Sequence, residues 1–230
     1  MNTHRKIAII VGIFFMFAVA TLFIGEALYK PILNSPDYLD NVYPNRIRII
    51  IGILLEFIGI LGLVLIPVYL FPILKKYDEV LALGYVSFRL FEALLLSIAQ
   101  VSKLLIINLS QDYLNKSKAD TSYFQNMGNS IKSVLNWVNS DGLIYLFVFG
   151  IGALILYSVL YRSKLIPQWL SIWGFVAGVS IIIATLIHRF EISTELALVF
   201  MLPIAFQEQV MAIWLIVKGF NPNTITSKSL

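Results

Sequence analysis

The sequence predicts an all-α, polytopic membrane protein: a bundle of about six transmembrane helices with both termini in the cytoplasm. Hydrophobic residues make up 59% of the 230 residues, and the mean hydropathy is +0.84. Only 13% of the residues are charged, which is about half of the ~25% typical of soluble domains. Most apolar residues gather in runs near the ~20-residue length that a membrane-spanning helix needs. Lipid is therefore the expected solvent for most of the chain.

Six apolar runs are the predicted spans, and we expect them to form one domain, residues 1–220. Pro167 stands beside the start of the fifth run, where the missing N–H of a proline costs nothing. Gly219 directly follows the sixth run, as a helix C-terminus favours. Pro203 lies inside the sixth run and predicts a kink there. The runs cover residues of about 7–29, 47–73, 80–108, 142–162, 168–187 and 195–218.

The first run shares some features with a secretory signal peptide, because His4, Arg5 and Lys6 form a basic head before it. However, the apolar stretch from residue 7 to 25 is longer than the ~7–15 residues of a signal core. It also continues past the small residues at 18–20, where cleavage would be expected. We therefore interpret this run as a retained membrane span.

The short connections between runs predict the orientation. Basic residues gather in the connections on one side, which the positive-inside rule assigns to the cytoplasm. The opposite side carries acidic and basic residues together. An even number of spans then places both termini in the cytoplasm and the protein in the cell membrane. The basic residues that support this orientation are Arg5, Lys6, Lys75, Lys76, Arg162, Lys164 and Lys218.

One connection is long, residues 109–141, and we place it outside the membrane. Its first part, residues 111–128, is polar and is expected to be irregular. Its second part predicts a short interfacial helix on the outer leaflet, although the segment could also be a simple tether. The tail, residues 221–230, is polar and is expected to be flexible. The apolar positions at helical spacing are Ile131, Val134, Leu135 and Val138.

Four ionisable residues in the middle of the apolar runs are the strongest functional signal: Glu56, Arg89, Glu92 and Glu208. Each lies about ten or more residues from the polar flank of its run, which at ~1.5 Å per residue places it near the centre of a ~30 Å hydrocarbon layer. Charged groups at that depth are unfavourable and mark sites where they pair or carry a function. We therefore expect these side chains to face the interior of the bundle.

The third run carries several polar residues on one helical face. Arg89 and Glu92 are three residues apart, so they can pair on the same helix. The polar stripe continues through Gln100 and Lys103 toward the outer surface. Such a stripe is expected to face other helices rather than lipid.

The second and sixth runs present their glutamates in different surroundings. Gly52 and Gly59 flank Glu56 on the same helical side, which predicts that another helix approaches closely there. In the sixth run, Gln207 directly precedes Glu208, so polar atoms point in more than one direction.

One arginine cannot neutralise three carboxylates. If the four residues are neighbours, a glutamate is protonated or a cation lies among them: a proton, a metal ion, an organic cation or a lysine such as Lys103. The leading hypothesis is an intramembrane pocket that binds a small polar or cationic ligand or relays protons. The alternative is a membrane scaffold in which the buried pairs only fix packing. The predicted ligand-binding residues are Glu56, Arg89, Glu92, Gln100, Lys103, Gln207 and Glu208.

A second alternative is an interfacial lipid hydrolase. His188 lies at the outer end of the fifth run, and Thr185 precedes it by three residues on the same helical face. A hydroxyl next to a histidine can act as a nucleophile and its base. These two residues are the only candidate catalytic pair, and an enzymatic function is not the leading hypothesis.

Several functional classes find no support in the sequence. The chain has no cysteine, which excludes disulfides, thiolate metal sites and cysteine nucleophiles. No metal site and no cofactor are predicted, because a zinc ion would depend almost entirely on carboxylates. Basic residues are scattered rather than clustered, so no nucleic-acid partner is predicted. The expected partner is the lipid bilayer, and the sequence leaves open whether copies of the chain form a homo-oligomer.

Three motifs occur from the third run onward. They are Phe88-Arg89-x-x-Glu92, then Leu165-Ile166-Pro167-x-Trp169-Leu170 leading to Trp173-Gly174, and Leu202-Pro203 followed by Gln207-Glu208 and Trp214-Leu215-Ile216-Val217-Lys218-Gly219-Phe220. Together they resemble a family of bacterial multi-span membrane proteins catalogued as domain of unknown function 4386. The resemblance covers most of the chain from the third run onward, and it implies about six helices in a bacterial inner membrane. It implies no activity, and Glu56 and the long outer connection are not part of the pattern.

Overall fold

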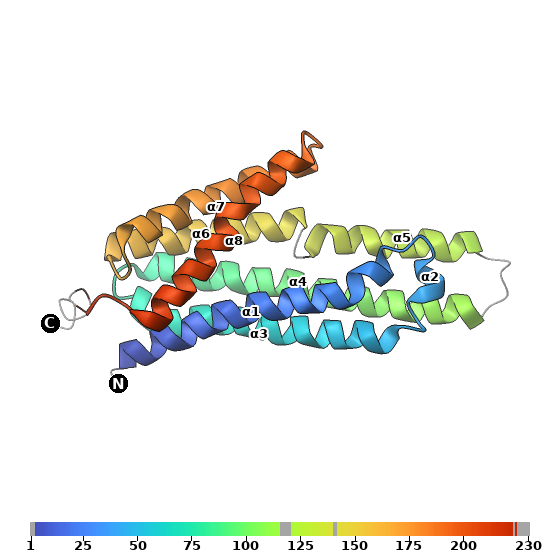
Figure 1. The fold of residues 1–230 in the computed structure, drawn as a ribbon, viewed down its shortest axis with the longest axis horizontal. Coiled ribbons are helices and arrows are strands. Elements are labelled where there is room, and N and C mark those ends of the chain that lie inside the picture. Colours follow the sequence, from blue (N-terminus) through green and yellow to red (C-terminus); the bar gives the residue numbers. More distant parts are fainter. Residues whose placement is uncertain (1–2, 116–120, 140–141, 223, 225–230) are drawn as a thin grey trace. The chain divides into compact units, whose positions relative to one another are not determined.

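The computed structural model describes residues 3–115, 121–139, 142–222 and 224, and within these residues the regular secondary structure consists of helices joined by turns and short irregular segments (Figure 1). Six stretches of the described chain are long and apolar enough to cross a membrane, and the fourth of them takes in both α5 and α6. The predicted all-helical fold is therefore confirmed. The helices are α1 (Thr3–Leu33), α2 (Tyr38–Asn41), α3 (Arg46–Leu74), α4 (Glu79–Asn115), α5 (Thr121–Val138), α6 (Leu143–Ser163), α7 (Gln168–Arg189) and α8 (Thr194–Val217).

The chain packs as two compact units. Unit 1 comprises Met1–Phe17, Gly62–Ala93 and Leu146–Leu230, so it takes in α7, α8 and nearly all of α6. Unit 2 comprises Ala18–Leu61 and Leu94–Tyr145, so it takes in α2 and α5. The helices α1, α3 and α4 each contribute residues to both units. The single domain predicted for residues 1–220 stays a prediction.

In unit 1, Arg5 holds the carboxyl end of α8. Its guanidinium donates hydrogen bonds to the carbonyl oxygens of residues 215–217 at distances of 2.6–3.1 Å. The last carbonyl groups of a helix have no partner within the helix, and a cation there also interacts favourably with the helix dipole. Arg5 therefore links the start of α1 to the end of α8.

Further contacts bring the polar connections of unit 1 to this same end. The Asn221 amide donates to the carbonyl oxygen of Leu165 at 2.8 Å. The Tyr77 hydroxyl donates to the carbonyl oxygen of Thr224 at 2.9 Å. Asn221 and Thr224 belong to the predicted flexible tail, of which residues 223 and 225–230 lie outside the described part of the chain.

The helices α7 and α8 pack against each other in unit 1. The Ser180 hydroxyl on α7 donates to the carbonyl oxygen of Phe200 on α8 at 2.7 Å. This carbonyl lies in the turn before Pro203, which is inside α8 as predicted. Pro203 removes the N–H that would pair with the carbonyl oxygen of Val199, which directly precedes the carbonyl that Ser180 contacts, and neighbouring hydroxyls commonly satisfy carbonyl groups near a proline within a membrane.

In unit 2, glycines bring α1 and α3 into backbone contact, as expected from the small residues around Glu56. A Cβ added at Gly52 would lie 2.7 Å from the carbonyl oxygen of Gly25. A Cβ at Gly59 would lie 3.2 Å from the carbonyl oxygen of Ala18. Only a hydrogen fits at these positions without movement of the backbone, so the glycines set the separation of the two helices.

The segment of residues 111–128, expected to be irregular, is helical in its described part. The helix α4 continues to Asn115, α5 begins at Thr121, and residues 116–120 lie outside the described chain. The physical reason is a longer apolar stripe than the sequence analysis identified. Within α5 the buried residues are Phe124, Gly128, Leu135 and Val138, which recur at spacings of three, four or seven residues.

The stripe on α5 packs against Tyr38 of α2. A Cβ at Gly128 would overlap the Tyr38 hydroxyl, because only 2.0 Å would separate them. Lys132 of α5 lies 4.2 Å from the centroid of the Tyr38 ring and donates to the carbonyl oxygen of Leu33 at 2.8 Å. Burial raises the pKa of the Tyr38 hydroxyl above its ordinary value, so this group stays protonated. The location of α5 at the outer leaflet stays a prediction.

We predict opposite effects for one substitution at two glycines. Gly52→Ala should destabilise the protein by about 1–3 kcal/mol, since the new methyl group meets a backbone oxygen that cannot move freely. Gly84→Ala is the matched control, because a Cβ there would meet nothing closer than 3.6 Å. It should be neutral or stabilising by up to roughly 1 kcal/mol, through the better helix propensity of alanine. Thermal unfolding in detergent measures both, and equal melting temperatures for the two variants would contradict the close approach.

Candidate functional site

A buried arginine with two carboxylates forms the polar centre of unit 1. The Arg89 Nη1 atom donates to both carboxylate oxygens of Glu92, at 3.1 and 2.9 Å. The Arg89 Nη2 atom lies 3.6 Å from Glu208 Oε1 on α8. The Nε atom donates to the Tyr85 hydroxyl at 3.2 Å. Every N–H-bearing nitrogen of this guanidinium therefore faces an oxygen of the protein.

The sequence of α4 explains much of this geometry. Tyr85, Arg89 and Glu92 are spaced by four and three residues, so they lie on one helical face. The guanidinium is also surrounded by aromatic rings, with the centroids of Phe15, Tyr85 and Phe149 at 5.4–5.8 Å. Cation–π attraction is strongest where water is excluded, so these rings further stabilise the buried positive charge of Arg89.

The two carboxylates of this network differ in their surroundings. The side chains of Arg89 and Glu92 are 3% and 1% exposed, whereas the side chain of Glu208 is 13% exposed. Glu92 makes a two-oxygen contact with the guanidinium, while Glu208 makes one longer contact. With all three groups ionised, their formal charges of +1, −1 and −1 leave the network with a surplus of one negative charge.

Gln207 ties this part of α8 to α6 and α7. Its side-chain oxygen accepts a hydrogen bond from the Tyr157 hydroxyl at 2.5 Å, and its amide donates to the carbonyl oxygen of Leu170 at 3.2 Å. The Tyr157 ring also lies against Gly174, where an added Cβ would come within 2.4 Å of it. Gln207 thus fixes the position of α8 against α6 and α7, and with it the position of Glu208, the next residue in the chain.

Tyr157 connects this hydrogen-bonded region to a pocket. The pocket has a volume of about 250 Å³ and lies between the end of α6 and the start of α7. Ser171, which is 0% exposed, also lines it, and its hydroxyl has no hydrogen-bond partner among the described residues. Sequence reasoning did not identify Tyr85, Tyr157 or Ser171; only the spacing of Tyr85 from Arg89 could have signalled a contact.

Unit 2 contains a second buried network, centred on Glu56 of α3. Lys103 of α4 pairs with Glu56, and its Nζ atom also donates to Gln100 Oε1 at 3.3 Å. The Gln100 amide donates to Glu56 Oε2 at 2.8 Å. The Tyr29 ring of α1 completes the environment, with its centroid 4.0 Å from Lys103 Nζ. Lys103 is 0% exposed, and one positive charge balances one negative charge.

The side-chain contacts of the seven predicted site residues therefore fall into two sets, one within each unit. Arg89, Glu92, Gln207 and Glu208 belong to unit 1, whereas Glu56, Gln100 and Lys103 belong to unit 2. The physical reason is that Lys103 supplies the positive charge that Glu56 requires. The sequence analysis included this lysine as one of the cations that could neutralise a glutamate.

The geometry around His188 gives no support to a catalytic pair. The Thr185 hydroxyl donates to the carbonyl oxygen of Ile181 at 2.6 Å, while His188 is exposed. Within the described part of the chain, the side chains of Thr185 and His188 share no hydrogen bond. No group of three or more His, Asp or Glu side chains among the described residues could hold a metal ion.

A comparison with protein families finds a match over most of the chain. The family described as a domain of unknown function (DUF4386) matches residues 10–219, which is most of the chain. The chain belongs to the DUF4386 family. No curated protein and no solved structure matches it. The match confirms the resemblance that the motifs indicated. Both buried networks lie within the matched residues 10–219.

We predict a large penalty for breaking the pair in unit 2. Lys103→Met should lower the free energy of unfolding by about 3–5 kcal/mol, because it leaves the Glu56 carboxylate buried without its cation. The double variant Glu56→Gln/Lys103→Met should recover much of this loss, since no net charge remains. Thermal or chemical unfolding in detergent measures all variants.

The matched control is Lys30→Met, which removes a lysine from the solvent-exposed pair with Glu26 on α1. Exposed pairs of this spacing contribute only about 0.3–0.5 kcal/mol. If Lys103→Met were no more destabilising than Lys30→Met, the buried pair would not be a major stabilising contact.

Proposed function

We propose that the Arg89–Glu92–Glu208 network is a binding site at which Glu208 takes up a proton or a small cation within the membrane. Arg89 and Glu92 then form a fixed pair, and Glu208 is the group whose charge changes. The proposal includes a location in a bacterial inner membrane with both termini in the cytoplasm, as the basic connections and the family resemblance suggest.

The surplus negative charge is the observation that carries this proposal. A single guanidinium balances one carboxylate, and the second carboxylate is far less stable as an unpaired anion among helices surrounded by lipid. Uptake of one proton or one monovalent cation makes the network neutral. The network therefore has a built-in affinity for a single positive charge.

The difference between the two carboxylates supports Glu208 as the variable group. Glu92 is almost fully buried and uses both oxygens on the guanidinium, an arrangement that favours a permanent ion pair. Glu208 is more exposed and its contact with Arg89 is longer. A group that exchanges protons or ions needs both access and a weaker hold on its partner, and Glu208 has both.

A route toward this site is suggested by the pocket between α6 and α7. Tyr157 lines the pocket, and its hydroxyl is hydrogen-bonded to Gln207, the neighbour of Glu208 in the sequence. Hydroxyl groups exchange protons with water, and the Ser171 hydroxyl lies in the same pocket, while the Gln207 amide only orients the Tyr157 hydroxyl. This arrangement supports proton exchange more directly than the binding of a larger ligand.

The network in unit 2 supports a structural role instead. Glu56 and Lys103 are balanced in charge, both are buried, and Gln100 donates to the Glu56 carboxylate. Such an arrangement fixes the register of α3 and α4 and has no surplus charge to attract a ligand. We therefore assign the scaffold hypothesis to this network and the binding hypothesis to the network of unit 1.

The variant Glu208→Gln tests the proposal, because it keeps the shape of the side chain and removes its charge. In proteoliposomes that contain a trapped pH-sensitive dye, proton movement after a pH jump should fall to the level of empty liposomes. Infrared difference spectra on acidification should lose the band of a protonated carboxyl group. The melting temperature should stay the same or rise, since an uncompensated charge has been removed.

The control is Glu195→Gln, which alters an exposed carboxylate in the first turn of the same helix. This variant should retain both the dye signal and the infrared band. A Glu208→Gln protein with wild-type proton movement and an unchanged infrared spectrum would show that Glu208 is not the titrating group. Adding sodium or tetramethylammonium to the wild type, and measuring the melting temperature, distinguishes cation binding from proton binding.

A further inference from the structure

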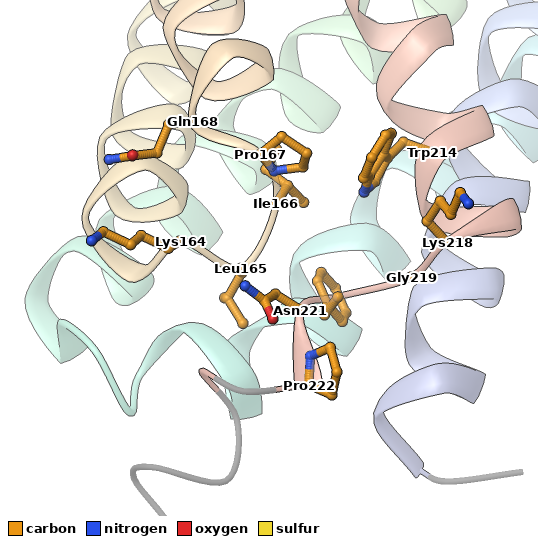
Figure 2. A pocket seen from close by; sticks show the side chains of 11 residues that line it. Lys164, Leu165, Ile166, Pro167, Gln168, Trp214, Lys218, Gly219, Asn221 and Pro222 are labelled. Atoms are coloured by element: carbon orange, nitrogen blue, oxygen red, sulfur yellow. The ribbon is translucent and has the colours of Figure 1, made fainter.

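A second pocket lies at the end of unit 1 that carries the basic residues. It has a volume of about 410 Å³ and is formed by the α6–α7 connection on one side and the end of α8 on the other (Figure 2). It is separate from the Arg89 network, and the proposed function does not use it. Its polar and aromatic lining includes Lys164, Gln168, Trp214, Lys218 and Asn221.

We propose that this pocket binds the phosphate-containing headgroup of an anionic phospholipid. Four features of the pocket favour this ligand: the charge of its rim, the unused donors in its wall, the rigidity of the surrounding backbone and the depth at which it opens. All four are independent of the function of Glu208.

The charge of the rim favours an anion. Lys164 and Lys218 stand on opposite sides of the pocket in Figure 2, where their ammonium groups point outward from it, and both side chains are exposed. Among the described residues that line the pocket, none is acidic. Because both side chains are long and exposed, each can rotate its ammonium group toward a bound phosphate, for which lysine is a common ligand.

The wall of the pocket offers hydrogen-bond donors that the protein does not use. The indole nitrogen of Trp214 lies on the edge of the ring that faces the pocket (Figure 2), and it has no hydrogen-bond partner among the described residues. The helix α7 begins at this pocket with Pro167 as its N-cap, which provides no side-chain cap. The amides of Leu170 and Ser171 donate to the carbonyl oxygen of Pro167, which leaves those of Gln168 and Trp169 for an anion, and the helix dipole favours a negative charge there.

The backbone around the pocket is held in place. The Asn221 amide donates to the carbonyl oxygen of Leu165, which joins the two sides of the pocket. Gly219 has a φ angle of +75°, and a Cβ at this position would lie 2.8 Å from Arg5 Nη1. A glycine is required by both its dihedral angle and this contact. A preformed pocket loses less entropy on binding, which favours a specific ligand.

The aromatic residues at this end place the pocket at the level of lipid headgroups. Trp169 stacks on Trp173 and meets Trp214 edge to face, with both pairs of ring centroids 6.4 Å apart. Tryptophans concentrate at the boundary between hydrocarbon and water. The remaining wall is apolar and includes Ile166 and Phe220. Apolar walls below a cationic rim match a phospholipid, with its phosphate above its glycerol and acyl chains, better than a free phosphate ion.

The test uses the full-length protein in detergent micelles, titrated with phosphatidylglycerol or phosphatidylcholine. Native mass spectrometry counts the lipids that stay bound, and the shift in melting temperature gives the affinity. We expect one retained phosphatidylglycerol and at least roughly tenfold weaker binding of phosphatidylcholine, whose headgroup has no net charge. Lys164→Gln/Lys218→Gln should weaken phosphatidylglycerol binding by about tenfold or more, the scale expected for lost charge-assisted hydrogen bonds.

The control is Lys6→Gln/Lys75→Gln, which removes the same charge from residues that do not line the pocket. This variant should bind phosphatidylglycerol like the wild type.

Trp214→Phe keeps an aromatic ring and removes the donor, so it tests the site even if the double lysine variant does not fold. It should also weaken binding. Equal binding of the two lipids, or wild-type affinity in both pocket variants, would overturn the proposal. Equally tight binding of glycerol 3-phosphate would overturn it in favour of a soluble phosphate ester.

Discussion

The neutralisation of Arg89 inside the protein is the constraint on which the centre of unit 1 depends. A guanidinium within helices that cross lipid cannot be hydrated by the bilayer, so its partners must come from the protein. Glu92 supplies a partner from the same helix, and Glu208 supplies one from α8. Because Arg89 holds a residue of another helix, the ion pairs determine where α8 packs as well as how the charge is stabilised.

The two buried networks meet the same physical requirement in different ways. In unit 2 a lysine and a glutamate cancel, and an amide side chain donates to the carboxylate. In unit 1 a guanidinium faces two carboxylates, and the balance is incomplete. A balanced pair favours stability and register, whereas a surplus negative charge favours uptake of a positive charge. This contrast is the reason that we propose a structural role for the Glu56 network and a binding role for the Arg89 network.

Much of the fold could be predicted from the sequence, because lipid imposes long apolar runs. All six predicted spans correspond to helices, and the glycines around Glu56 lie at a close contact as expected. The Arg89–Glu92 pair was also predictable, since residues three apart share a helical face. The helix α5 was predicted only in its second half, because its apolar stripe begins with isolated residues, Phe124 and Gly128, within a polar sequence.

The assignment of each glutamate to its cation was not predictable. Glu56 and Lys103 are far apart in the sequence, and so are Arg89 and Glu208, and no local pattern says which helices are neighbours. Tyr157 and Gln207 show the same difficulty, since their hydrogen bond depends on how α6 and α8 cross. Depth in the membrane could be estimated from each run separately, whereas pairing depends on tertiary packing.

The contact between Arg5 and the end of α8 has a consequence for biosynthesis. Unit 1 joins Met1–Phe17 to Leu146–Leu230, so its earliest and latest translated segments pack together. The Arg5 guanidinium cannot meet the carbonyl groups of residues 215–217 until the ribosome has produced the last helix. A nascent chain that stops earlier keeps Arg89 without Glu208 and Tyr157 without Gln207. Assembly of unit 1 is therefore complete only after α8 has been synthesised and has packed, and a chain that stops before α8 leaves these polar groups without their partners.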